Sequence, residues 1–140
     1  MTMMPSQDDL DFRDVFETGG VAPDDFSHRA HLRLAYVYLC EAGIDTAMPR
    51  MRNALHTFLK RNGVPASKYH ETLTRSWLMA VQHFMDRASP AASFNGFLSQ
   101  DDRLLDTGIM LTHYSKDTLF SDAARAAFVA PDLQAIPPAP

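Results

Sequence analysis

The chain is poor in cysteine and has no long apolar run. Cys40 is its only cysteine, so no disulfide bond can form within the chain, and this usage is typical of a reducing compartment. The opening residues, MTMMPSQDDLDF, contain neither the basic nor the apolar region of a secretory signal. No apolar run approaches the roughly eighteen residues that span a bilayer. We therefore expect a cytoplasmic protein with no membrane partner.

The chain also lacks an excess of basic residues. It has 13 Lys and Arg against 17 Asp and Glu, a net charge of −4. Proteins that bind nucleic acid non-specifically need surplus cations to displace counterions from the phosphates, so we expect no nucleic-acid partner. We find no glycine-rich phosphate loop, internal repeat or long alternating strand pattern. A composition that is 46% hydrophobic over 140 residues predicts one globular domain, residues 1–140.

Apolar residues recur at helical spacing in four segments that are bounded by helix-start and helix-stop signals. The first begins at Ser27, whose hydroxyl can cap a helix, and is followed by Gly43. The third is preceded by Ser67, a second expected cap. We predict an all-α fold, an up-down bundle of four main helices. These helices are expected at residues 27–42, 45–61, 68–87 and 101–114.

The ends of the chain are expected to be less regular. Residues 10–16 and 122–129 predict short additional helices, the second capped by Ser121. Residues 1–8 are polar, and we expect them to be flexible. The tail, residues 131–140 (PDLQAIPPAP), is expected to be extended, because proline cannot continue a helix.

Two histidines, His28 and His31, stand three residues apart at the start of the first main helix. This spacing puts them on one helix face, with Cβ atoms about 5–6 Å apart. In an up-down bundle the first and third helices begin at the same end, where the fourth helix stops. His70, at the start of the third, and His113, at the end of the fourth, are therefore expected to join them.

Three imidazoles in one place suit a divalent transition metal such as Zn, Fe, Ni or Cu. We predict His28, His31 and His70 as the metal ligands. Glu71 or His113 would then serve as a fourth ligand or as the catalytic acid or base. For Glu71 the alternative is an ordinary surface ion pair with Arg75, four residues further along the helix.

Two further residues are expected near the cofactor. Tyr69 precedes His70 and could line the site with its hydroxyl, although packing of its ring is the alternative. Thr74 lies one turn after His70 on the same face, so its hydroxyl could orient the imidazole ring.

The same residues carry a resemblance to a family of small bacterial proteins of unassigned function. The shared pattern spans most of residues 16–136 and contains Phe-x-His-x-x-His, Tyr-His-x-Thr, Tyr-Ser and Pro-Asp-Leu elements. The resemblance implies that His28, His31 and His70 belong together, and it brings no established activity. In this chain the elements are Phe26, His28 and His31; Tyr69, His70 and Thr72; Tyr114 and Ser115; and Pro131, Asp132 and Leu133.

Three hypotheses about function follow. The first is a metal-binding helical bundle that acts on a small-molecule ligand as a hydrolase, lyase or oxygenase. The second is a non-enzymatic interaction or regulatory protein whose histidines form a buried polar network, with a homodimer contact as one setting for it. The third is a metal-free enzyme that uses His70 for acid–base chemistry.

Overall fold

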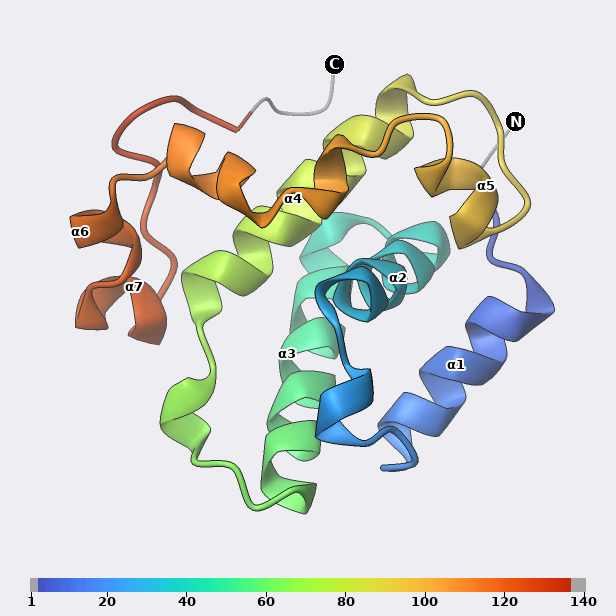
Figure 1. The fold of residues 1–140 in the computed structure, drawn as a ribbon, viewed down its shortest axis with the longest axis horizontal. Helices are drawn as coiled ribbons and strands as arrows, with labels where there is room; N and C mark the ends of the chain where they lie inside the picture. The colour runs from blue at the N-terminus through green and yellow to red at the C-terminus, as the bar shows by residue number, and fades with distance from the viewer. Residues whose placement is uncertain (1–2, 137–140) are drawn as a thin grey trace.

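The computed structural model describes residues 3–136 and is built from helices (Figure 1). The predicted all-α fold is confirmed, with four longer helices packed as a bundle. In the part of the chain described, no helix is both long and apolar enough to cross a membrane. The longer helices are α1 (Gln7–Glu17), α2 (His28–Glu41), α3 (Ile44–Arg61) and α4 (Glu71–Arg87). The short ones are α5 (Phe94–Leu98), α6 (Lys116–Leu119) and α7 (Asp122–Ala126), with 3₁₀ segments η1 (Pro23–Asp25), η2 (Ala66–Lys68), η3 (Arg103–Leu105) and η4 (Thr107–Thr112).

The four longer helices differ in one member from those that the sequence predicts. Three of the predicted helices correspond to α2, α3 and α4, but the fourth is α1. The predicted helix at 101–114 is wrong, because this stretch forms the 3₁₀ segments η3 and η4. Asp106 interrupts it: its carboxylate accepts a hydrogen bond of 2.9 Å from the N–H of Gly108. Such local side-chain bonds compete with a continuous helix.

Near the termini, the structure extends one predicted helix and shortens another. Helix α1 begins at Gln7 rather than at residue 10, because Ser6 and Asp9 form a reciprocal capping box. Helix α7 ends at Ala126 instead of reaching residue 129. Of residues 1–8, predicted to be flexible, Met4 hydrogen-bonds Ala91 and residues 7–8 belong to α1. Residues 1–2 of that segment, and residues 137–140 of the tail predicted to be extended (131–140), lie outside the described residues.

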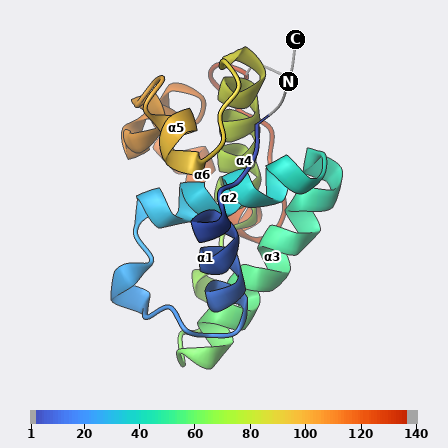
Figure 2. The same ribbon diagram turned by 90° about the vertical axis from the view of Figure 1, so that its right-hand side faces the viewer.

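Helix α2 lies at the centre of the bundle and contacts α1, α3 and α4 (Figures 1 and 2). Seven of its fourteen residues are buried, from Leu32 to Leu39. Aromatic rings fill the contact between α1 and α3: the ring of Phe16 lies 5.0 Å from that of Phe58 and 4.6 Å from that of Phe26. Apolar burial of this kind is the main stabilising contribution in a helical domain.

Asp9 joins three helices at a buried position, where its side chain is only 5% exposed. Its carboxylate accepts hydrogen bonds from the Arg33 guanidinium on α2 and from the backbone N–H groups of Ser6 and Phe94. Burial alone would raise the pKa of Asp9, but these hydrogen bonds outweigh it and lower the pKa. The charge is thus stabilised where α1, α2 and α5 meet.

The carboxyl segment, which we define as residues 99–136, lies against α4 and the start of α2 (orange to red in Figure 1). Side chains of the helices hydrogen-bond its backbone carbonyls: His28 donates to Leu104, and Thr72 to Ala127. Within the segment, buried Tyr114 donates to the carbonyl of Val129 at 2.6 Å. Directed hydrogen bonds therefore hold this irregular segment in place.

Candidate functional site

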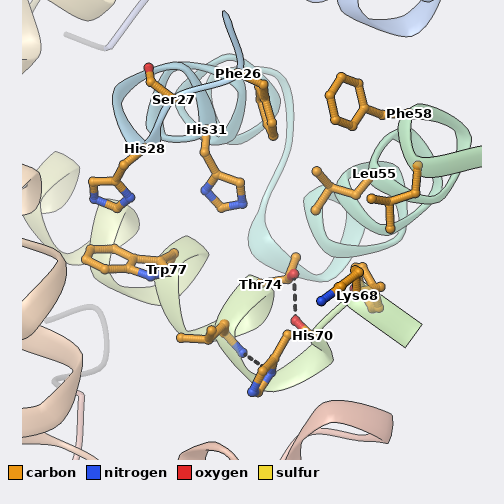
Figure 3. A pocket seen from close by; sticks show the side chains of 13 residues that line it. Phe26, Ser27, His28, His31, Leu55, Phe58, Lys68, His70, Thr74 and Trp77 are labelled. Atoms are coloured by element: carbon orange, nitrogen blue, oxygen red, sulfur yellow. Dashed lines mark hydrogen bonds between the residues drawn. The ribbon is translucent and has the colours of Figure 1, made fainter. Parts of the chain in front are cut away.

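A cavity of about 330 Å³ opens between the start of α2, the second half of α3 and the start of α4 (Figure 3). Aromatic and aliphatic side chains form most of its wall. His28, His31 and His70 all contribute to the lining, so the structure brings the first turn of α2 and the beginning of α4 to one cavity. The apolar wall residues are Phe26, Leu55, Phe58, Leu59, Leu73 and Trp77.

His31 is the cavity histidine with free nitrogen atoms. Its half-buried ring points from α2 toward the cavity (Figure 3), 5.8 Å from the ring of Phe26, and makes no hydrogen bond to any described residue. Burial, together with the neighbouring His28, lowers the pKa of His31 to about 4. The imidazole is therefore neutral at pH 7 and offers a bound molecule one N–H donor and one lone pair.

His28 connects the start of α2 to the carboxyl segment. Its Nε2 lies 2.9 Å from the carbonyl oxygen of Leu104, so this nitrogen must carry the proton and donate. The ring also meets the indole of Trp77 edge-on, with centroids 4.5 Å apart. Nδ1 carries the lone pair in this tautomer and has no hydrogen-bond partner among the described residues.

The sequence predicts His70 within the first turn of its helix, but in the structure His70 is the N-cap residue of α4. Its Nδ1 accepts a hydrogen bond of 3.1 Å from the N–H of Leu73, while Nε2 donates to the carbonyl of Leu119 at 2.7 Å. Burial lowers the pKa of His70, consistent with this neutral form. The expected cap, Ser67, lies in η2 instead. Both ring nitrogens of His70 are thus used within the protein.

Glu71 lies outside the cavity lining, on the other side of Tyr69. Its carboxylate receives two hydrogen bonds from the Arg52 guanidinium, of 3.0 and 2.7 Å, and one of 2.6 Å from the Tyr69 hydroxyl. The Arg52 contact is the main reason why the pKa of Glu71 is lowered. Its ion-pair partner is therefore Arg52 of α3, and the expected pairing with Arg75 is wrong.

The other predicted site residues have different partners. Tyr69 is among the residues that line the cavity, but its hydroxyl, the group predicted to face the site, donates to Glu71 instead. The Thr74 hydroxyl donates to the backbone carbonyl of His70 at 2.8 Å, so it does not orient the imidazole ring. His113 lies outside the cavity lining, and its Nδ1 donates to the carbonyl of Gln134 at 2.7 Å.

As arranged, these residues do not form a three-histidine metal site. A metal ligand needs a free lone pair, and the lone pair of His70 accepts the N–H of Leu73. In Figure 3 the His70 ring also points away from His28 and His31. Within residues 3–136, no group of three or more His, Cys, Asp or Glu side chains is placed to hold an ion. Only the imidazoles of His28 and His31 keep a nitrogen lone pair that could bind a metal ion.

One polar residue of the cavity was not found by the sequence reasoning. Lys68, the last residue of η2, lies at the rim and brings the only ammonium group of the lining. Its position two residues before His70 could have indicated that it lies near the site. The sequence analysis instead placed Lys68 in a helix beginning at residue 68 and did not consider it as a site residue. Helix α3 contributes Leu55, Phe58 and Leu59 to the cavity wall, and none of them was predicted as a site residue.

Comparison of the chain with protein-family models, curated proteins and solved structures finds no match. The resemblance to a small bacterial family therefore stays a prediction. Its pattern residues do have identifiable contacts here: Ser115 and Asp132, for example, are joined by hydrogen bonds of 2.9 and 2.7 Å.

Proposed function

We propose that the protein binds a small molecule in the cavity between α2, α3 and α4, with His31 as its main polar contact. The observation that carries this proposal is an imidazole without a hydrogen-bond partner in a largely apolar cavity. Small-molecule sites have this composition, apolar walls with a few polar groups that fix orientation. Among the described residues, the His31 nitrogens are not buried unpartnered atoms, so they are accessible and can hydrogen-bond a ligand in the cavity.

The low pKa of His31 favours binding over acid–base catalysis. A general base is most effective when its pKa lies near the working pH, whereas burial lowers the pKa of His31 to about 4. His70 is also poorly placed for this chemistry, because both of its nitrogens are engaged. The support for a catalytic reaction is therefore weaker than the support for a binding site.

A divalent transition metal is the second candidate ligand, favoured by the free nitrogens of His31 and the free Nδ1 of His28, one helical turn away. With two protein ligands, such an ion would depend on water or a bound molecule for its remaining donors. The non-enzymatic alternative assigns the histidines a structural role. It is supported by the bonds of His28 and His70 to distant carbonyls.

Nuclear magnetic resonance titration with a set of small aromatic and aliphatic molecules tests the proposal. We expect shifts at the His31 ring and at the Trp77 indole, and weaker binding in the His31→Phe variant. His83→Phe is the matched control, because His83 is a half-buried histidine of α4 outside the cavity lining. Shifts that map elsewhere, or equal binding by His31→Phe, would contradict the proposal.

A zinc titration of protein purified without an affinity tag tests the metal candidate. Stoichiometric uptake that is lost in both His31→Gln and His70→Ala would support the three-histidine site of the sequence prediction. Uptake that depends on His28 and His31 but not on His70 would support a two-histidine site. If no zinc is taken up at stoichiometric level, the metal candidate fails and only the small-molecule proposal remains.

A further inference from the structure

The charge around the cavity has one sign. Among the described residues that line it, Lys68 is the only one with a permanent charge, and none is Asp or Glu. Two carboxylates directly adjoin lining residues in the sequence, and neither belongs to the lining: Glu71 is paired with Arg52, and Asp25 is exposed in η1. This is notable in a chain whose net charge is −4. The cavity therefore favours an anionic group over a cationic one.

Two hydrogen-bond donors reach the cavity from different elements (Figure 3). The Lys68 ammonium comes from η2 and supplies up to three N–H groups, and the neutral His31 imidazole of α2 supplies one. Charge-assisted hydrogen bonds from an ammonium to a carboxylate are stronger than neutral ones. One ammonium and one imidazole match a monoanion rather than a group with several negative charges.

The remaining wall defines the other end of the ligand. Phe26, Leu55, Phe58 and Trp77 present aromatic and aliphatic surface, and the volume of about 330 Å³ is at the small end of the range for ligand sites. A chain of about eight carbons, or a single aromatic ring with a short linker, is the kind of body that such a cavity takes.

We propose that the ligand is a small amphiphilic carboxylate. Its carboxylate pairs with Lys68 and accepts the N–H of His31, while its apolar body packs among Phe26, Phe58 and Trp77. This inference rests on the proposed small-molecule site and adds its ligand class.

Three probes with the same body and different head groups test the inference: octanoate, octan-1-ol and octylammonium. Trp77 is the only tryptophan and lines the cavity, so its fluorescence reports binding without a label. We expect octanoate to bind the full chain about three- to tenfold more tightly than octan-1-ol, and octylammonium to bind least. Shortening the acid to heptanoate should weaken binding about fourfold, the effect of one buried methylene.

Two lysine variants separate the charge effect from the apolar effect. Lys68→Met keeps the length of the side chain and should reduce the affinity for octanoate to that for octan-1-ol, with the alcohol unaffected. Lys116→Met is the matched control, because Lys116 is exposed in α6 and lies outside the cavity lining; it should bind all three probes as the parent chain does.

The two proposals fail in different ways. Equal affinities for octanoate and octan-1-ol, or an unchanged octanoate affinity in Lys68→Met, would overturn the carboxylate inference and leave the small-molecule site standing. If none of the probes shifts Trp77 fluorescence or the His31 resonances at millimolar concentration, the inference and the proposed site both fail for ligands of this size.

Discussion

Helix α2 buries seven of its fourteen residues against its neighbours, whereas the carboxyl segment buries a few separate side chains, such as Leu104, Tyr114 and Leu119. The helices are joined by continuous apolar faces, which tolerate small shifts because the hydrophobic effect has no direction. The carboxyl segment is attached by hydrogen bonds from side chains to single carbonyl groups, and these depend on distance and angle. Removing a single hydrogen bond should therefore destabilise the carboxyl segment, whereas the bundle should be destabilised mainly by substitutions that reduce apolar packing.

The largest effect is expected for a cavity in the bundle. Leu78 of α4 is fully buried, and Leu78→Ala should lower the free energy of unfolding by about 2–5 kcal/mol. Leu133→Ala, in the carboxyl segment, removes the same atoms from a side chain that is 60% exposed and should cost less than about 0.5 kcal/mol. Urea unfolding followed by circular dichroism measures both. Similar losses for the two variants would contradict the difference described between the regions.

Acidification should weaken the helical region through His31. Its pKa is about 4 in the folded chain and about 6.5 when unfolded, so between these values the unfolded state binds the extra proton. The unfolding free energy should thus fall as the pH is lowered from 6.5 toward 4, by up to about 1.4 kcal/mol per pH unit. Urea unfolding at pH 7, 6 and 5 should show a shallower decline for His31→Phe. An equal decline in both proteins would exclude this role.

Removing one hydroxyl should loosen the carboxyl segment specifically. Tyr114→Phe leaves the Val129 carbonyl and the Ser76 hydroxyl without their partner, which should cost about 1–3 kcal/mol. Hydrogen exchange is expected to accelerate in residues 99–136 and to stay slow in α2 and α3. Tyr36→Phe is the matched control, because that hydroxyl donates to Met4 at the other end of the chain. Faster exchange across the whole bundle in Tyr114→Phe would show that the segment does not open on its own.

The smallest effect is expected for His28→Gln. The substitution breaks or lengthens the hydrogen bond to Leu104, for a loss of about 0.5–1.5 kcal/mol, and should lower the melting temperature by about 2–5 °C. Ligand affinity at the cavity should be retained, because His31 supplies the main polar contact. A complete loss of binding in His28→Gln would move that contact from His31 to His28.

The sequence was sufficient to predict the helices whose packing depends on their own residues. The apolar spacing and the Ser27 cap identify α2. Apolar spacing identifies α3 and α4 as well, although α3 has no side-chain cap and α4 is capped by His70 rather than Ser67. Residues 101–114 have apolar residues at the right spacing, but the bond from Gly108 to Asp106 breaks the helix. In this stretch a single local hydrogen bond prevents the helix that the apolar spacing predicts.

The candidate site was predictable only in its location. Helix direction brought His28, His31 and His70 to one cavity. The partners of the His28 and His70 rings are backbone groups, which nearly every residue has and which therefore leave no mark in a sequence. His70 was hidden as a cap because imidazole is not among the usual capping groups. Whether His28 or His31 stays free depends on where Leu104 lies, 76 residues further along the chain.

These long separations also bear on the order in which the protein folds. The bonds of His28 and His70 to the carboxyl segment span 76 and 49 residues, whereas α2, α3 and α4 are consecutive in the chain and pack on one another. Contacts between distant residues form late, because closing a long loop costs entropy before it gains any bond. During synthesis we expect the bundle to assemble first, with Nε2 of the capping residue His70 lacking its carbonyl partner until Leu119 is made. The last third of the chain would then lock a structure that the first two thirds have already formed.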